Sequence, residues 1–366
     1  MMNKEIKALY IHIPFCEAIC DYCDFPKLQY FRIFAEQYIT ELSKELDSYH
    51  INHQLDTIYV GGGTPTCLED GLFEQLLILI KPYTKGVKEY TVEANPESLS
   101  EHKLTLMKQY GVNRLSIGVE STNDKILKAI NRHHTFQDVK IAIKRAKSIG
   151  FDNLSVDLII GLPHVLKGQL NEDITKILSL GVSHISCYSL SVHPNTVFGI
   201  KGIKERTSDT ERELYDLVNQ KLSDSGYEHY EISNWCLPGY ESKHNLTYWK
   251  DEQYYGIGLG ASGYINDVRY TNTRSITEYL KGKRVIEKEV VTLKDDREYF
   301  ILLNLRTNRG IPLDLYQAKF HENLLETKKE EIQNLIKQKL LYIEGQNLIA
   351  TYDGMMVLDQ VILQLF

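Results

Sequence analysis

The sequence predicts an α/β fold in which helices cover a parallel sheet, with a smaller α+β subdomain at the C-terminal end. Six short β-rich runs alternate with amphipathic stretches of helical period over about the first two hundred residues, as in sheets with helical crossovers. Cysteines, glycines and acidic residues gather where the predicted strands end. The alternation of strands and helices stops near Thr207. The alternation fits either a doubly wound sheet or a partial barrel.

The six strands are predicted from runs rich in β-branched and aromatic residues. They span Ala8–Ile13, Thr57–Val60, Glu89–Val92, Arg114–Val119, Leu154–Ile160 and His184–Leu190. Helices are predicted between them at Phe34–Ser48, Leu72–Ile80, Glu101–Tyr110, Phe136–Ile149 and Gln169–Leu180. Three glycines closely follow helices, as C-terminal stop signals do: Gly111, Gly150 and Gly181.

The second half of the chain has a different pattern. A helix is predicted over Thr210–Ser223, and a Tyr-rich, glycine-punctuated region with little clear period follows at Gly226–Tyr270. The last segment mixes helical stretches with short β-like pieces: Tyr299–Leu305, Leu325–Gln338, Leu341–Glu344 and Leu348–Thr351. We therefore expect three parts, residues 1–205, 206–290 and 291–366.

Composition excludes several classes of protein. The 366 residues are 43% hydrophobic and 25% charged, which is ordinary for a globular protein. The net charge of −7 argues against a general nucleic-acid binder, which needs clustered Lys and Arg. No apolar run approaches the ~18 residues that span a bilayer, and the polar N-terminus shows no signal peptide. We expect a cytoplasmic protein.

Three of the six cysteines form the strongest motif in the sequence. Cys16, Cys20 and Cys23 crowd together after the first predicted strand, while the other three are scattered. Thiolates bind iron–sulfur clusters and zinc alike. A structural zinc site normally has four ligands, whereas three cysteines leave one iron of a cubane open to a cofactor. The motif favours a 4Fe–4S cluster, with zinc as the alternative.

Other polar residues and glycines lie at the same predicted edge of the sheet. The run Gly61–Thr66 follows the second strand, Glu93 follows the third, Glu120 follows the fourth and Asp157 lies late in the fifth. Parallel sheets and barrels carry their active sites at this edge. A glycine run alone is more often a turn, and Glu93 alone would be a solvated acid. A carboxylate at Asp157 is harder to explain without a ligand, because burial of a charge is costly.

A second glycine run, Gly258–Gly263, formally matches a dinucleotide fingerprint. No clear helix opens after it, and no βαβ unit surrounds it, so the context for nicotinamide binding is missing. We expect a tight turn that packs against the sheet.

The motif His244-Asn245-Leu246-Thr247-Tyr248-Trp249 combines a candidate axial ligand with two aromatic side chains. A lone histidine is usually a hydrogen-bonded structural residue, although neutral imidazole also binds metals. Adjacent aromatic rings supply the apolar wall that a porphyrin needs. His229 and Cys236 are alternative ligands. Since the motif lies outside the six strand–helix repeats, we expect its pocket to be separate from the site at the strand ends.

The segment Tyr10–Cys16 and the three cysteines resemble the opening signature of HemN-type radical S-adenosylmethionine (SAM) proteins. The resemblance continues through Gly61–Thr66, Glu93–Pro96, Ser116–Ser121, Arg132–Thr135 and Asp157–Pro163. It implies a partial (β/α)6 TIM-like barrel of the radical SAM type over residues 1–205, a HemN-like extension over 206–290 and a small α+β subdomain over 291–366.

Within that family, the His244 motif resembles the heme-binding motif of the HemW heme chaperones. Cys23-Asp24-Phe25 also resembles this branch, since coproporphyrinogen III dehydrogenases typically have a further cysteine where Phe25 stands. The chain also begins a few residues before its first strand, without room for the N-terminal extension of those dehydrogenases. The branch resemblance implies that heme binds at His244.

The resemblance implies a site for each cofactor. Cys16, Cys20 and Cys23 would hold the 4Fe–4S cluster, and Glu120 departs from the Gln common in relatives. The positions that match SAM contacts are Tyr10, Tyr22, Gly62, Gly63, Thr64, Glu93, Glu120, Arg132 and Asp157, with Ser191 by a looser alignment.

Two functions are consistent with these resemblances. The protein is either a chaperone that binds heme and transfers it to acceptor proteins, or an oxygen-independent coproporphyrinogen III dehydrogenase that decarboxylates propionates by radical chemistry. The motif at His244 favours the chaperone. The expected partners are heme and heme-accepting proteins, and not nucleic acid. Contact with a membrane protein stays open, because no anchor is visible.

Overall fold

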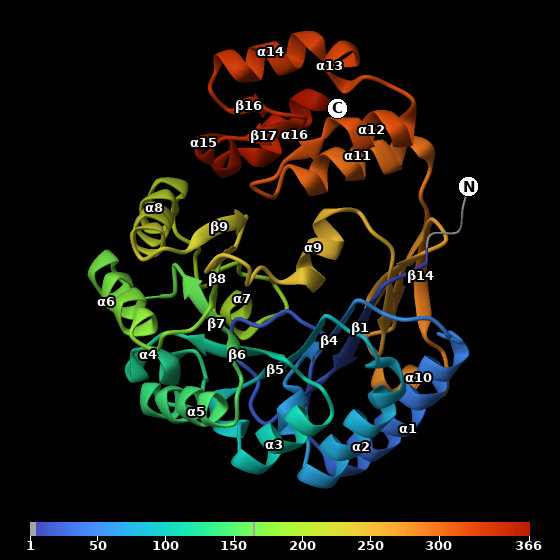
Figure 1. Cartoon of the computed structure of the whole chain (residues 1–366). Helices are drawn as coiled ribbons and strands as arrows, with labels where there is room; N and C mark the ends of the chain where they lie inside the picture. The colour runs from blue at the N-terminus through green and yellow to red at the C-terminus, as the bar shows by residue number, and fades with distance from the viewer. Residues whose placement is uncertain (1–4, 164) are drawn as a thin grey trace.

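A twelve-stranded sheet forms the centre of the protein (Figure 1). The computed structural model describes residues 5–163 and 165–366. Six parallel strands make the middle of the sheet in the order of the sequence: β1 (Ala8–Ile13), β4 (Thr57–Gly62), β5 (Glu89–Ala94), β6 (Arg114–Glu120), β7 (Asn153–Ile160) and β8 (His184–Ser189). All six predicted strands are therefore confirmed.

The sheet curves into an open barrel with its helices outside (Figure 1). These helices are α1 (Arg32–Ser48), α2 (Asp70–Ile80), α3 (Glu101–Gln109), α4 (Asp124–Ala129), α5 (Phe136–Ser148) and α6 (Lys167–Leu178). In the described ranges no pairing joins the two edge strands, β9 and β14. A partial barrel, rather than a doubly wound sheet, is the result.

The alternation of side chains along each strand explains both the core and the site. Residues of one parity, such as Ile58, Val60 and Ile117, are apolar and belong to the large core beneath the outer helices. Residues of the other parity, such as Ser116 and Ser186, are polar and line a cavity inside the barrel. Successive strand residues point to opposite faces, so the sequence itself makes the inside of the barrel hydrophilic.

Strands from the second half of the chain extend the sheet at both ends. After α8 (Ser208–Asp224), β9 (Glu228–Glu231) and β10 (Asn234–Cys236) continue antiparallel beyond β8. β11 (Tyr254–Ile257) lies parallel to β1, and β12 (Ser262–Ile265), β13 (Val268–Asn272) and β14 (Val285–Val290) follow antiparallel. Residues 206–290 thus share one sheet with the first half.

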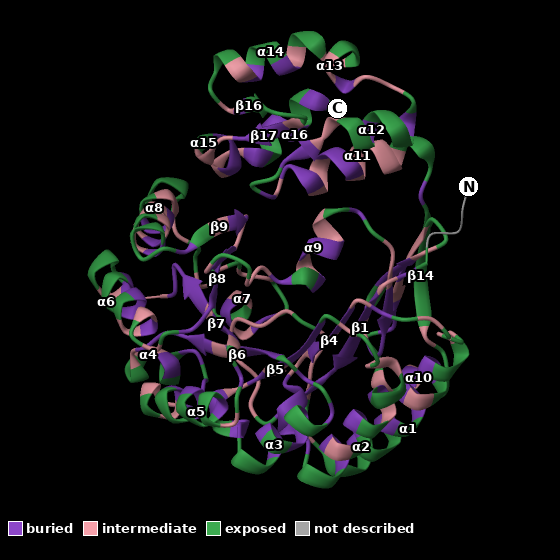
Figure 2. Ribbon diagram, in the orientation of Figure 1, coloured by how far each residue is buried: buried purple, intermediate pink, exposed green. Residues whose placement is uncertain are grey.

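Residues 291–366 build a second core of their own. Helices α11 (Leu293–Asn304), α12 (Leu313–Phe320), α14 (Lys329–Lys337) and α16 (Leu358–Leu365) surround a three-stranded sheet of β15 (Ile311–Pro312), β17 (Asn347–Ala350) and β16 (Leu341–Glu344). Figure 2 shows that these elements bury one face and expose the other. None of the helices in the described part of the chain is both long and apolar enough to cross a membrane.

The expected turn at Gly258–Gly263 is confirmed. Gly258 and Gly260 have positive φ angles of 106° and 69° and connect β11 to β12. Glycine adopts such angles without steric cost. A Cβ atom on Gly258 would also lie 2.6 Å from the backbone oxygen of His12. The glycines therefore serve a tight turn against β1, and no helix opens there to bind a dinucleotide.

Candidate functional site

A cavity of about 520 Å³ lies inside the barrel and reaches the carboxyl ends of its parallel strands. The cysteine loop, the glycine run after β4 and acidic residues from β5, β6 and β7 all line it. Eleven predicted cluster and SAM residues contribute to its wall: Cys16, Cys20, Tyr22, Cys23, Gly62, Gly63, Thr64, Glu93, Glu120, Arg132 and Asp157. Ser191 also lines the cavity, as its looser alignment predicts.

Each of the three thiols has a donor or a cation beside it. The Thr64 hydroxyl donates to Cys16 Sγ at 3.8 Å, and Arg132 Nη1 lies 3.7 Å from Cys20 Sγ. Burial raises the pKa of Cys16 to about 12 and also raises that of Cys23, where the charge of Lys27 opposes the rise. Ligation by a metal deprotonates such thiols. The donors fit an anionic, thiolate-bound group at this place.

The glycine run brings the backbone close to the cysteine loop. A Cβ atom on Gly63 would lie 2.6 Å from the Phe15 carbonyl oxygen and 3.0 Å from Cys16 Sγ. Gly62 has φ 112°, and its N–H donates to Glu93 Oε2 at 2.9 Å. The Tyr59 hydroxyl donates to the other oxygen, Oε1, at 2.6 Å. Glu93 is thus held in a fixed orientation at the cavity wall.

Three carboxyl groups face one another across the cavity. Burial raises the pKa of Asp157 to about 7, and the charges of Glu120 and Glu93 add to the rise. Burial likewise raises the pKa of Glu93. Clustered carboxylates favour a cationic ligand, and the sulfonium of SAM is such a cation. Arg132 Nη2 lies 3.5 Å from Glu120 Oε1, so the two buried charges partly offset each other.

Tyr10 lies below this wall rather than on it. Its hydroxyl is 2.9 Å from His12 Nδ1, and its ring lies 6.0 Å from that of Tyr59. His12 Nε2 in turn bonds to the Pro26 carbonyl oxygen at 2.7 Å. Tyr10 therefore supports the loop that follows the cysteines, and it does not line the cavity itself.

The predicted heme motif forms helix α9 (Lys243–Trp249), which closes the amino end of the barrel. Glu89, at the start of β5, accepts hydrogen bonds from the backbone N–H groups of Lys243 and His244 at 2.9 and 3.0 Å. These bonds tie the first turn of α9 to the barrel. Asn245 lines the same cavity as the cysteines. His244 itself does not line that cavity, so the expected separation of the two sites stays a prediction.

His244 is fully buried, and both of its ring nitrogens are hydrogen bonded. Nδ1 lies 2.8 Å from the Thr57 hydroxyl, and Nε2 lies 2.8 Å from the hydroxyl of Tyr248, on the same helix. The imidazole also stacks on Tyr59 with ring centroids 5.2 Å apart. Burial, reinforced by the charge of Arg114, lowers the pKa of His244 to about 3. The ring is therefore neutral at physiological pH, as an axial ligand must be.

The alternative ligands lie on the neighbouring strands β9 and β10. His229 stacks on Trp235 with centroids 4.2 Å apart and bonds to the Tyr215 hydroxyl at 3.0 Å. Cys236 is fully buried and belongs to a small cluster with Tyr230 and Leu246. Both residues have structural packing roles away from the cavity wall.

Sequence analysis missed several residues of the cavity. Strand alternation could have indicated those that point inward, whereas those on loops and on α9 depend on tertiary structure. They are Lys27, Tyr59, Arg114, Ser116, Ser186, Tyr188, Asn245 and Arg274.

Comparisons with known proteins agree with this geometry. The Radical SAM superfamily model matches residues 10–177, and the HemN C-terminal domain model matches residues 291–357. The heme chaperone HemW of Lactococcus lactis is 38% identical, over 96% of this chain and 95% of that protein. The Bacillus subtilis heme chaperone HemW is 37% identical, over 97% and 98%.

The structure of Escherichia coli coproporphyrinogen III oxidase, HemN, superimposes with a TM-score of 0.85 at 20% identity, and the match covers 98% of this chain and 89% of that one. This similarity shows a shared fold. Fold and site together define a radical SAM protein, which implies a 4Fe–4S cluster and SAM as cofactors. Within that superfamily, the chain belongs to the HemW family.

Proposed function

We propose that the protein is a heme chaperone, which binds heme and passes it to acceptor proteins. The relatives at 37–38% identity carry that name along nearly the whole chain. The single observation in the structure that carries the proposal is His244, a buried, neutral imidazole on α9 at the amino end of the barrel. Neutral imidazole is a standard axial ligand for heme iron.

Heme binding at His244 requires one local rearrangement. Nε2 is engaged by the Tyr248 hydroxyl, one turn further along the same helix. Rotation of Tyr248 away from His244 frees this nitrogen, while the bond of Nδ1 to Thr57 keeps the ring oriented. A hydrogen bond to the second nitrogen sets the tautomer of a metal-binding histidine. A single ligand that must be freed suits a carrier, which also has to release its cargo.

The cluster and SAM occupy the other end of the cavity in this proposal. Cys16, Cys20 and Cys23 hold the cluster, whose open iron supplies a coordination site for the amino and carboxylate groups of SAM. The acids would orient the nucleoside and face the sulfonium, and the backbone at Gly62–Thr64 would bind the amino group. Because Asn245 of α9 lines the same cavity, SAM bound there would lie in the same cavity as this residue of the helix. We assign the protein to the cytoplasm, where thiols stay reduced.

Two assays on one preparation test this function. Reconstituted protein loaded with heme is mixed with apomyoglobin, a general heme acceptor, and transfer is followed by the Soret band. The same preparation is incubated anaerobically with SAM, a reductant and coproporphyrinogen III. The proposal requires transfer and no decarboxylation at enzymatic rates. Decarboxylation without heme binding would make the protein an oxygen-independent coproporphyrinogen III dehydrogenase instead.

A further inference from the structure

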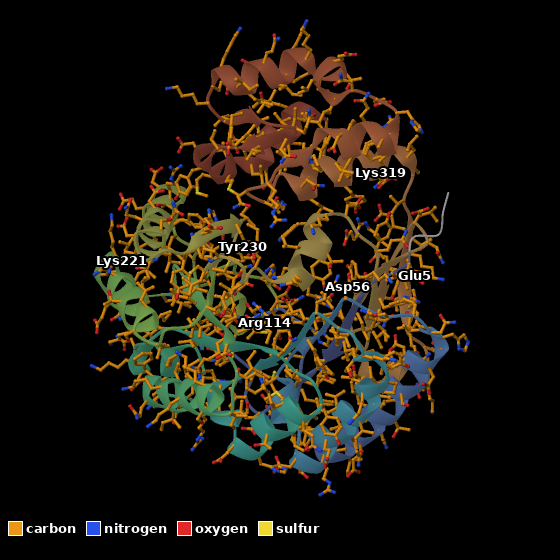
Figure 3. All side chains as sticks on the ribbon, in the orientation of Figure 1. Glu5, Asp56, Arg114, Lys221, Tyr230 and Lys319 are labelled. Atoms are coloured by element: carbon orange, nitrogen blue, oxygen red, sulfur yellow. The ribbon has the colours of Figure 1, made fainter. Side chains whose placement is uncertain are left out.

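Arg114 is a buried cation that the functions described so far do not use. It begins β6 at the centre of the barrel (Figure 3) and is 2% exposed, yet its side chain lines the cavity. Its Nε–H has no hydrogen-bond partner among the described residues. A guanidinium presents five donors, and leaving such a group buried without a partner is costly.

The acid that contributes most to the electrostatic environment of Arg114 is already engaged. Glu89 raises the pKa of Arg114 against the effect of burial, but its two carboxylate oxygens accept hydrogen bonds from the first turn of α9. Two other polar side chains at this end of the barrel, Ser155 and His184, bond to each other at 2.8 Å. The guanidinium is therefore free to meet a ligand that enters the cavity.

The carboxylate of SAM is expected nearer the cluster than Arg114. Arg132, beside Cys20, bonds to the carbonyl oxygen of Gly118, and Arg114 precedes Gly118 by four residues of the same strand. A strand rises about 3.3 Å per residue, so the two backbone positions are separated by about 13 Å. Arg132 is therefore the arginine beside the cysteines, and Arg114 begins the strand deeper in the cavity, where a second anion can meet it.

His244 lies at the same depth. His244 stacks on Tyr59, which is level with Thr91 and Arg114 in the register of β4, β5 and β6, and the next residue along α9, Asn245, shares the cavity wall with Arg114. We propose that Arg114 binds a propionate carboxylate of heme while His244 binds the iron. This inference rests on the proposed function and deepens it, because it adds an anion-binding anchor to the heme site. Guanidinium and carboxylate form paired, charge-assisted hydrogen bonds.

The test separates recognition of the propionate from any structural role of Arg114. Heme and its dimethyl ester, in which both carboxylates are blocked, are titrated into wild type, Arg114→Gln and Arg114→Lys. The measured quantity is the ratio of the two dissociation constants for each protein. Arg145→Gln, on the exposed face of α5, is the matched control.

We expect wild type and Arg145→Gln to prefer heme over the ester. Arg114→Gln should reduce this preference about tenfold or more, the effect of losing a hydrogen bond between charged groups, while its affinity for the ester stays near that of wild type. Arg114→Lys should keep part of the preference. If Arg114 had only a structural role, the substitution would weaken the binding of heme and of its ester equally.

An unchanged ratio in Arg114→Gln would overturn the propionate assignment and leave the heme chaperone function intact. A wild type that binds neither heme nor ester would overturn both. If Arg114→Gln does not fold, the ratio of the two dissociation constants of wild type still tests the proposal. Equal affinity of wild type for heme and for its dimethyl ester would refute an anion-binding anchor.

Discussion

Replacing Asp157 with Asn tests how the cavity recognises SAM. Burial and the charges of Glu120 and Glu93 raise the pKa of Asp157 from 3.8 to about 7. Below pH 7 the carboxyl group is mostly protonated, and Asn is then a close substitute in size and polarity. Above pH 7 the carboxylate would attract the sulfonium and accept hydrogen bonds from the ribose in the proposed complex. The cost of the substitution should therefore grow with pH.

At pH 6 we expect wild type and Asp157→Asn to bind SAM with affinities within about threefold of each other. At pH 8 the variant loses a hydrogen bond to a charged group, which is worth about 1.5–3 kcal/mol, or roughly 10- to 150-fold in affinity. The assay is anaerobic calorimetry on cluster-reconstituted protein between pH 6 and 8. The control is Asp152→Asn, because Asp152 is exposed and lies just before the first residue of β7.

The stability of the ligand-free protein gives an independent check of the same pKa. Because the folded pKa of about 7 lies above the ordinary value of 3.8, the folded state binds more protons than the unfolded state between these values. Stability from this group is fully present below pH 4 and is lost as the pH rises towards 7. Asp157→Asn should therefore raise the melting temperature at pH 8. Equal pH dependence of SAM binding in wild type and variant would refute the reasoning.

Two further predictions concern the cluster. Replacing all three predicted ligands with Ala should abolish the cubane's iron content of roughly four per chain and its absorption at about 400 nm. The control Cys67→Ala should retain both the iron and the absorption. The opposite pattern would show that the ligand assignment is wrong. Gly63→Ala should also impair reconstitution, because a Cβ there would lie 2.6 Å from the Phe15 carbonyl oxygen, whereas Gly71→Ala, with nothing within 4 Å, should not. Normal iron content in Gly63→Ala would show that the close approach is dispensable. The three predicted cluster ligands are Cys16, Cys20 and Cys23.

The sequence was sufficient to predict the first half of the fold. Each of the six parallel strands contains β-branched or aromatic residues, and each is followed by a helix with a clear period, so local pattern and global fold agree. The acids and glycines at the strand ends could be recognised for the same reason. Asp157 is a charged residue in a buried strand, which a purely structural role does not explain.

The second half could not be predicted in this way. The strands from β9 to β13 are three to five residues long, too short to show a period of two. β11 is positioned by its pairing with β1, some 250 residues away in the sequence, which no local pattern records. The place of α9 depends on Glu89, whose carboxylate holds the first turn of the helix. The link between the heme motif and the SAM cavity is therefore a property of tertiary structure.

Arg114 and Tyr59 were missed for a different reason. Both stand in ordinary strand sequences, where an arginine or a tyrosine is common and carries no motif. Their importance comes from strand parity, which points them into the barrel, and from the absence of a hydrogen-bond partner for Arg114 Nε among the described residues. Parity could have indicated the direction of these side chains, but only the tertiary structure reveals the unpaired Nε–H group of Arg114.

Heme titration followed by the Soret band tests most directly whether His244 binds the heme iron. The proteins are wild type, His244→Ala, the triple cysteine variant and His102→Ala, a control on an exposed face of α3. The account predicts stoichiometric heme binding in wild type, in the cysteine variant and in the control, with clear loss in His244→Ala. The axial imidazole should also disappear from the spectrum of any residual complex. Heme binding by His244→Ala with the affinity and spectrum of wild type would contradict the account.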